Sequence, residues 1–324
     1  MSPFGGGKKL SFMKTIALDL GGTRLKLSLV ADGKVIAETI LPAFSDNGLI
    51  PRLKSIEEAV SLMLAGMKME VSQLTGVGIS IPGIVDTKQM RVLSINKKFI
   101  DVTGFDFNKW TEETWGIPVH LENDARAALI GEWQYGAGKG CDDLVLVTIG
   151  TGIGGAAMIE GKLLQGRHFQ AGCLGGHFTI NMHGSECTCG NVGCVEAEAS
   201  TWKLPGLLRN HPGFAQSKAS EAGLLDFETL FALAEQGDQT CIDVMNHCLD
   251  AWSAGIVTMI HAYDPEMVII GGGVMKSEKI ILPYIRQKVA QHAWTPWGRV
   301  KIESAHFTDQ AGMLGIAYLL ENKD

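Results

Sequence analysis

Short apolar runs alternate with glycine-rich turns along the chain, a pattern that predicts β-strands joined by sharp reversals. The first run, Thr15–Leu20, ends at a Gly-Gly-Thr turn and is followed by Leu25–Val30 and Lys34–Ile40. Asp32-Gly33 separates the last two runs, and this dipeptide is typical of a two-residue hairpin because both positions favour positive φ. The beginning of the chain therefore predicts three consecutive strands.

A helix is predicted next, followed by a buried strand. Ser55 and Glu58 have the spacing of a capping box. The apolar residues after Ser55 recur at helical spacing and predict one buried face, made by Ile56, Ala59, Val60, Met63 and Met67. Gly76–Ile81 reads as a strand that Pro82-Gly83 stops.

The strand pattern recurs in the second half of the chain. Leu144–Ile149 is an apolar run that ends at a Gly-Thr-Gly turn, Gly154–Ile159 follows it, and Glu160-Gly161 precedes a third run, Lys162–Leu164. Two hairpins can resemble each other by chance. The same order of runs and turns nevertheless predicts two α/β domains of one topology that face each other across a cleft.

The C-terminal third predicts two further helices and one strand. An apolar stripe runs through Gln239–Ala262 and stops before Asp264-Pro265, since the residue before proline disfavours helix. Met267–Ile270 predicts a strand that ends in three consecutive glycines, and Ala311–Leu320 predicts the last helix. The segment 202–225 has no readable pattern.

Composition and charge narrow the class of protein. The 324 residues are 46% hydrophobic and 19% charged, which is globular and of a size for two domains. The formal net charge of −7 argues against a general nucleic-acid binder. No apolar run approaches the length of a membrane span, and residues 1–12 lack the apolar core of a signal peptide. We therefore expect a cytoplasmic protein with reduced thiols and a disordered lead-in at 1–12. We further expect a small domain at 13–121, which the C-terminal helix at about 309–324 joins, and a large domain at 122–308.

Three glycine-rich turns each follow an apolar strand, at residues 21–22, 150–155 and 271–273. Glycine lets backbone N–H groups approach an anion closely, so three such turns predict an extended phosphate cradle. The alternative is that each turn only reverses its own chain. A P-loop motif is absent, and the G-x-G-x-x-G at Gly150 precedes a predicted strand and not a helix, which excludes a dinucleotide-binding fold.

Two acidic positions adjoin predicted turns. Asp19 ends the first strand, where a carboxylate can hold Mg²⁺ through water beside bound phosphates; alternatively it bonds its own turn. Asn123 and Asp124 precede a helix-forming run, where such residues usually cap the helix. Together they also suit gripping a substrate hydroxyl and accepting its proton.

The strongest local motif is His177 followed by Cys187-x-Cys189-x₄-Cys194. Three thiolates and one imidazole form a closed tetrahedral zinc site, which predicts a structural metal. The alternatives are three clustered free cysteines, or His183 as the histidine ligand. Glu196 follows the loop and is a candidate acceptor for a polyol, or else a surface glutamate. The other cysteines are expected to be buried: Cys141, Cys173, Cys241 and Cys248.

These motifs occur in an order that resembles one family. The segments in question are Asp19-Leu-Gly-Gly-Thr23, Pro82-Gly-Ile-Val-Asp86, Glu122-Asn-Asp124, Gly150-Thr-Gly-Ile-Gly-Gly155, Gly176-His177 with the cysteine loop through Glu196, and Gly271–Gly273. From Met13 to the C-terminus the chain resembles the ROK family of bacterial sugar kinases and sugar-responsive repressors.

The resemblance implies a two-domain actin-like, hexokinase-type ATPase fold with a substrate cleft between the domains, and the cofactors ATP, Mg²⁺ and structural Zn²⁺. It implies Asp124 as the catalytic base. Sugar-binding positions would be Asn96, Asn123, Asp124, His177 and Glu196. Nucleotide and Mg²⁺ would be held by Asp19, Gly21, Gly22, Thr23, Thr151, Gly152, Gly272 and Gly273. Zinc would be held by His177, Cys187, Cys189 and Cys194. A homodimer or homotetramer is expected from the family.

One departure bears on the substrate. The family usually has Glu-x-Gly-His, but here Leu174 or, with a frame shift of one, Cys173 takes the glutamate position. Losing one acceptor for a sugar hydroxyl costs roughly 1–3 kcal/mol of binding free energy. The departure therefore bears on whether glucose is the substrate more than on whether the protein phosphorylates a sugar. We expect an ATP-dependent kinase of a hexose or hexose derivative that acts on a primary hydroxyl. The rivals are a non-catalytic sugar-binding protein and a repressor, and the eighteen residues before Asp19 are too few for a helix-turn-helix domain.

Overall fold

The computed structural model describes residues 13–322, so the predicted lead-in at 1–12 lies outside it. The strands are β1 (Lys14–Leu20), β2 (Arg24–Ala31), β3 (Lys34–Pro42), β4 (Gly76–Ile81), β5 (Ile84–Asp86), β6 (Arg91–Ser94), β7 (Val119–Asn123), β8 (Leu144–Ile149), β9 (Ile153–Ile159), β10 (Lys162–Leu163), β11 (Met267–Gly271) and β12 (Lys301–Ser304). The α-helices are α1 (Leu53–Gly66), α2 (Phe107–Trp115), α3 (Asp124–Tyr135), α4 (Val195–Ala199), α5 (Leu204–Arg209), α6 (Phe227–Glu235), α7 (Gln239–Tyr263), α8 (Glu278–His292) and α9 (Ala311–Glu321).

Two five-stranded sheets share one topology. The first has the order β3-β2-β1-β4-β7 and the second β10-β9-β8-β11-β12. In the first sheet the central strand β1 pairs antiparallel with β2 and parallel with β4. In the second sheet β8 pairs in the same way with β9 and β11. The predicted internal repeat is confirmed, because both halves contain the same sequence of pairings.

The predicted hairpin turns adopt the backbone that their residues favour. Asp32 and Gly33 have φ of 50° and 68°, and Glu160 and Gly161 have φ of 52° and 69°. Positive φ at both positions is the type I′ signature, whose twist matches that of the flanking strands. Since β9 follows the Gly150 turn directly, the exclusion of a dinucleotide-binding fold is confirmed as well.

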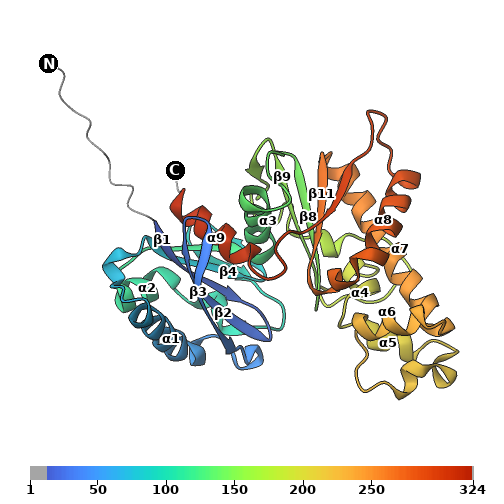
Figure 1. The fold of residues 1–324 in the computed structure, drawn as a ribbon, viewed down its shortest axis with the longest axis horizontal. Coiled ribbons are helices and arrows are strands. Elements are labelled where there is room, and N and C mark those ends of the chain that lie inside the picture. The colour runs from blue at the N-terminus through green and yellow to red at the C-terminus, as the bar shows by residue number, and fades with distance from the viewer. Residues whose placement is uncertain (1–12, 323–324) are drawn as a thin grey trace.

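Helices cover the sheets and join the two halves (Figure 1). Helices α1 and α2 lie beside the first sheet, α7 and α8 beside the second, and α3 and α9 pack against each other between them. The C-terminal helix α9 contacts β1 and β4, and its buried residues share a cluster with Ala17 and Val30. The last helix of the chain thereby completes the core of the first sheet. Between residues 13 and 322, no helix is long and apolar enough to cross a lipid bilayer.

The predicted capping box at Ser55 and Glu58 is wrong. Helix α1 begins at Leu53, directly after a 3₁₀ turn at Ile50–Arg52, and its N-cap Arg52 makes no side-chain cap. The carboxylate of Asp101 accepts hydrogen bonds from the N–H groups of Leu49 and Ile50 at 2.7 and 2.8 Å. A residue distant in sequence therefore satisfies the start of this helical segment.

Candidate active site and metal centre

Asp124 is the first residue of α3, immediately after β7. Asn123 caps the helix: its Oδ1 accepts from the N–H of Arg126 at 3.1 Å, and its Nδ2 donates to the carbonyl of Gly83 and to Oδ1 of Asp124. The N–H of Ala125 also donates to Oδ1 of Asp124, at 2.8 Å. In the described part of the chain, both hydrogen bonds that neighbouring residues donate to this carboxylate end on Oδ1 and none ends on Oδ2.

Burial raises the pKa of Asp124 above its ordinary value. The N–H of Ala125 and the positive charge of Lys98 act against that rise. A carboxylate with a raised pKa accepts a proton more readily than one in water, and such groups concentrate at catalytic sites.

A second carboxylate lies near the first. Asp19, next to the end of β1, accepts a hydrogen bond from Ser80 Oγ at 3.1 Å. The pKa of Asp19 is raised to about 6, first by burial and then by the charge of Asp124, while Lys26 opposes both effects. Lys26 is itself paired with Asp309 at 2.8 Å. The two carboxylates raise each other's energy when both are charged, and a divalent cation between them would relieve that repulsion.

Three of the predicted site residues converge on the start of β9. The N–H of Ile153 donates to Oε2 of Glu196 at 2.8 Å. A Cβ on Gly176, next to His177, would collide with the carbonyl of Ile153. A Cβ on Gly154 would lie 3.3 Å from the Cβ of Ala125, next to Asp124. Glu196 thus contacts this short segment directly, and the chain neighbours of His177 and Asp124 pack against it, although the three residues lie far apart in sequence.

A buried ion pair joins the end of β7 to the first turn of α3 on either side of Asp124. Arg126 and Glu122 have side chains 0% and 1% exposed, with 3.6 Å between Nη1 and Oε1. Nη2 of Arg126 donates to the carbonyls of Phe169 and Ala171 at 3.1 and 2.6 Å. Burial raises the pKa of Glu122, and Arg126 opposes that rise. The pair ties α3 to the loop that leads to His177, and sequence reasoning missed Arg126 because nothing in its local pattern marks a buried arginine.

This pair predicts a non-additive effect on stability. Arg126→Met is expected to lower the free energy of unfolding by about 3–5 kcal/mol, because it leaves a buried carboxylate without its partner. Glu122→Gln should cost a similar amount, and the double variant should lose less than the sum of the two. Urea unfolding measures all three, with Lys301→Met, from an exposed pair with Glu266, as a control worth about 0–1 kcal/mol. Additive losses would contradict the coupling.

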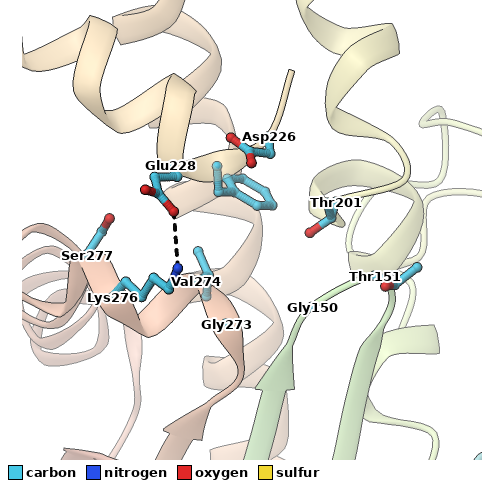
Figure 2. Close-up of a pocket in the computed structure, with 10 residues that line it drawn as sticks. Gly150, Thr151, Thr201, Asp226, Glu228, Gly273, Val274, Lys276 and Ser277 are labelled. Atoms are coloured by element: carbon cyan, nitrogen blue, oxygen red, sulfur yellow. Dashed lines mark hydrogen bonds and ion pairs between the residues drawn. The ribbon is translucent and has the colours of Figure 1, made fainter. Parts of the chain in front are cut away.

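A pocket of about 230 Å³ opens where β8 and β11 end (Figure 2). Gly150, Thr151 and Gly273 line it together with Asp226 and Thr201, and the N–H of Thr201 donates to the carbonyl of Gly150 at 3.2 Å. A Cβ on Gly272, whose φ is 96°, would meet the carbonyl of Ile149, so only glycine fits where these turns approach each other. Two of the three predicted glycine turns therefore share one pocket.

Charged side chains at the mouth of this pocket were not predicted. Nζ of Lys276 and Oε2 of Glu228 form an ion pair at 3.2 Å, drawn dashed in Figure 2. Asp226 caps α6 by accepting from the N–H of Thr229 at 2.8 Å. The sequence indicates that Asp226 can cap the helix that follows it, but the residues around Asp226 do not indicate that it lies beside a pocket.

The predicted metal ligands form one cluster. The ligand atoms of His177, Cys187, Cys189 and Cys194 all lie within 4.8 Å of one another, whereas His183 is exposed and outside the cluster. Sγ of Cys189 and Sγ of Cys194 are 3.8 Å apart, and Sγ of Cys187 is 3.6 Å from Nδ1 of His177. A tetrahedron with Zn–S near 2.3 Å and Zn–N near 2.0 Å has edges of about 3.8 and 3.6 Å. The residues fit zinc.

The loop that carries the cysteines is shaped by its glycines and by burial. Gly190 and Gly193 have φ of 90° and 66°, the left-handed region that glycine tolerates. The pKa of Cys194 is raised to about 12, mainly by burial and also by the charge of Cys187. Buried, clustered thiols of this kind become thiolates only beside a cation, which a bound metal supplies. The four cysteines outside the cluster are buried, as predicted.

The predicted sugar contact Asn96 makes another bond in the structure, and the position of the family's glutamate holds no carboxylate. Asn96 is exposed, and its Nδ2 donates to Oγ1 of Thr188 in the metal loop at 2.9 Å. Cys173 directs its thiol to the carbonyls of Phe169 and Gln170, and Leu174 is apolar. Neither residue at the family's glutamate position supplies a carboxylate.

These features define the class: an α/β protein with the two-domain actin-like ATPase fold of hexokinases. The ROK family model matches residues 15–323, and the chain belongs to the ROK family. It is 32% identical to a glucokinase of Thermotoga maritima over 96% of this chain and 98% of that protein. It is 29% identical to an N-acetylmannosamine kinase of Shigella boydii over 96% and 99%.

Solved structures of ROK family proteins have the same fold as this chain. A ROK family glucokinase from Streptomyces griseus, in complex with glucose and AMPPNP, superposes with a TM-score of 0.77 at 29% identity, over 94% of this chain and 98% of that one. A ROK family transcriptional regulator, a homologue of the E. coli MLC protein, gives 0.80 at 26% identity, over 95% and 78%. The family thus contains both kinases and regulators of this fold.

Proposed function

We propose that the protein is an ATP-dependent kinase that phosphorylates a hexose or hexose derivative on a primary hydroxyl. The observation that carries the proposal is Asp124, whose pKa is raised and whose Oδ2 is left for a substrate. The relatives named glucokinase and N-acetylmannosamine kinase support a sugar as the acceptor.

In the proposed reaction Asp124 accepts the proton of the sugar hydroxyl as its oxygen attacks the terminal phosphorus. Nδ2 of Asn123 and the N–H of Ala125 both donate to Oδ1 of Asp124 and so hold its carboxylate in place. Phosphoryl transfer requires little more of the protein than positioning, a base and electrostatic stabilisation.

The nucleotide would lie between the two sheets. We assign its phosphates and Mg²⁺ to Asp19, Gly21, Gly22 and Thr23, and the rest of the nucleotide to Thr151, Gly152, Gly272, Gly273 and the 230 Å³ pocket. Bound Mg²⁺ supplies positive charge that neutralises the phosphates. The mutually repelling carboxylates of Asp19 and Asp124 fit the binding of this cation. We further propose that the halves at 13–121 and 122–308 act as domains that close on the substrates.

The sugar would meet residues that the metal loop positions. His177 turns Nδ1 toward Cys187, which leaves Nε2 for a hydroxyl, and Glu196 follows the last cysteine on α4. Asn96 and Asn123 complete the proposed sugar side. Residues 173 and 174 lack a carboxylate, so one hydroxyl of glucose would have no acceptor, at a cost of about 1–3 kcal/mol of binding free energy. We therefore expect glucose to be a poorer substrate than a hexose derivative that makes a compensating contact.

A sugar panel tests the proposal. ADP release is measured with Mg-ATP and glucose, fructose, mannose, allose or an N-acetylated hexosamine. The proposal expects turnover with at least one of them. Sugar binding detected by calorimetry without ADP release from any sugar would instead favour a non-catalytic sugar-binding protein.

The raised pKa of Asp124 predicts an acid limit to turnover. The base must be deprotonated, so kcat/KM falls as pH falls through the pKa of Asp124, which burial places above the ordinary aspartate value of about 3.9. Initial rates between pH 4 and 9 measure this limb, and thermal melts at each pH control for unfolding. A rate that stays constant down to pH 4 in folded protein would rule out this base.

A further inference from the structure

Lys98 lies against the first glycine turn. The residue is half-buried in the loop between β6 and the 3₁₀ turn Ile100–Gly104. A Cβ on Gly22 would lie 2.5 Å from Cε and 2.7 Å from Nζ of Lys98. The ammonium group therefore touches the backbone that follows β1, and the glycine makes room for it.

A chain of hydrogen bonds holds the loop in this place. Ser45 Oγ donates to the carbonyl of Gly22 at 2.7 Å, and the N–H of Phe99 donates to the carbonyl of Ser45 at 2.9 Å. The side chain of Phe99 is fully buried in the core of the first sheet. Ser45 thereby fixes Lys98 relative to the turn.

The backbone on both sides of Lys98 is in an unfavourable conformation. Lys97 and Phe99 have φ of 63° and 48°, in the left-handed region. Such residues cost of order 1–3 kcal/mol each and persist only where the surroundings impose them, which is common at functional sites. Here the imposed shape brings one lysine inward and leaves its neighbour Lys97 exposed.

The charge of Lys98 has no fixed partner. Within residues 13–322 its Nζ makes no hydrogen bond or ion pair, whereas Lys26, the cation that acts on Asp19, is paired with Asp309. The charge of Lys98 nevertheless acts on Asp124 and lowers the pKa of that carboxyl. An unpaired ammonium thus lies at the glycine turn and near the proposed base.

We infer that Lys98 is a further catalytic residue whose ammonium contacts the terminal phosphoryl group of the nucleotide. The inference rests on the proposed kinase function. The sugar oxygen forms a bond to the terminal phosphorus, the bond from that phosphorus to the bridging oxygen breaks, and ADP leaves. The hydroxyl proton goes to Asp124. Lys98 keeps its proton throughout and neutralises charge on the transferred phosphoryl oxygens, as cationic clamps do in phosphoryl transfer.

Lys98→Met tests this role, with Lys97→Met as the matched control. Removing one such electrostatic contact is expected to lower kcat by about 10²-fold, with little change in the KM for sugar. Lys98→Arg should recover part of the rate because it restores the charge. Equal kcat values for Lys98→Met and Lys97→Met would overturn the assignment, and so would a Lys98→Arg variant no faster than Lys98→Met.

A binding measurement separates this inference from the kinase proposal. Calorimetry with AMP-PNP and with AMP needs no turnover. Lys98→Met is expected to weaken AMP-PNP by about tenfold and to leave AMP unchanged, since AMP lacks the terminal phosphates. A tenfold change corresponds to about 1.4 kcal/mol. Equal losses for both nucleotides, or no loss for either, would overturn the inference even in a protein that phosphorylates sugars.

Discussion

Asp124→Asn is expected to lower kcat by about 10²- to 10⁴-fold, the range that general-base catalysis contributes. The amide is close in shape to the carboxylate and can still accept from Ala125 N–H, but it cannot take up the sugar proton. Sugar affinity should therefore change far less than kcat. Steady-state ADP release gives kcat, and calorimetry gives the sugar Kd.

Asp142→Asn is the control, because Asp142 is an exposed aspartate in the loop between α3 and β8. It should keep the wild-type rate. An Asp124→Asn variant that retains most of its turnover would mean that another group takes the proton. A variant that loses sugar binding in the same proportion as rate would mean that Asp124 serves binding and not proton transfer.

Loss of the metal is expected to have the second large effect. Cys194 is fully buried and lies between the other thiols and α4. Cys194→Ser should weaken zinc by more than about 100-fold, since even substitutions outside the ligand shell cost 10- to 100-fold. Because Cys194 precedes Glu196, and Glu196 bonds Ile153, turnover and thermal stability should fall together. Metal analysis by mass spectrometry gives the zinc content per chain.

Cys141→Ser controls for the loss of a buried thiol. Cys141 donates to the carbonyl of Asp143 outside the metal cluster, and serine preserves that bond. The control should keep about one zinc per chain. Wild-type protein with less than about half a zinc per chain, or a Cys194→Ser variant that keeps its zinc, would contradict a Cys₃His zinc site.

Local sequence signals predicted the framework of this protein well. Apolar runs ended by glycine turns located β1, β4 and β8 to within one residue, and Asp-Gly and Glu-Gly located the hairpin turns. The ligand spacing after His177 predicted which four residues cluster. These features depend on short-range backbone preferences and on loop length, so they can be read from neighbouring residues.

Features set by tertiary contacts could not be read in this way. The start of α1 depends on Asp101, about fifty residues away, and not on Ser55. The burial of Arg126 depends on carbonyls of a distant loop. Lys98 was uninformative in the sequence, because its approach to Gly22 follows from the bonds that Ser45 makes. The segment 202–225 had no period because it is made of short turns around α5.

The most direct test of the central claim is the identity of the product. Purified protein, Mg-ATP and the sugar panel are examined by proton-coupled ³¹P NMR. A phosphate ester on a primary alcohol is coupled to the two protons of one CH₂ group, so the account predicts a new triplet together with ADP. A doublet from a secondary or anomeric ester would contradict it, as would unchanged ATP with every sugar in folded, zinc-loaded protein.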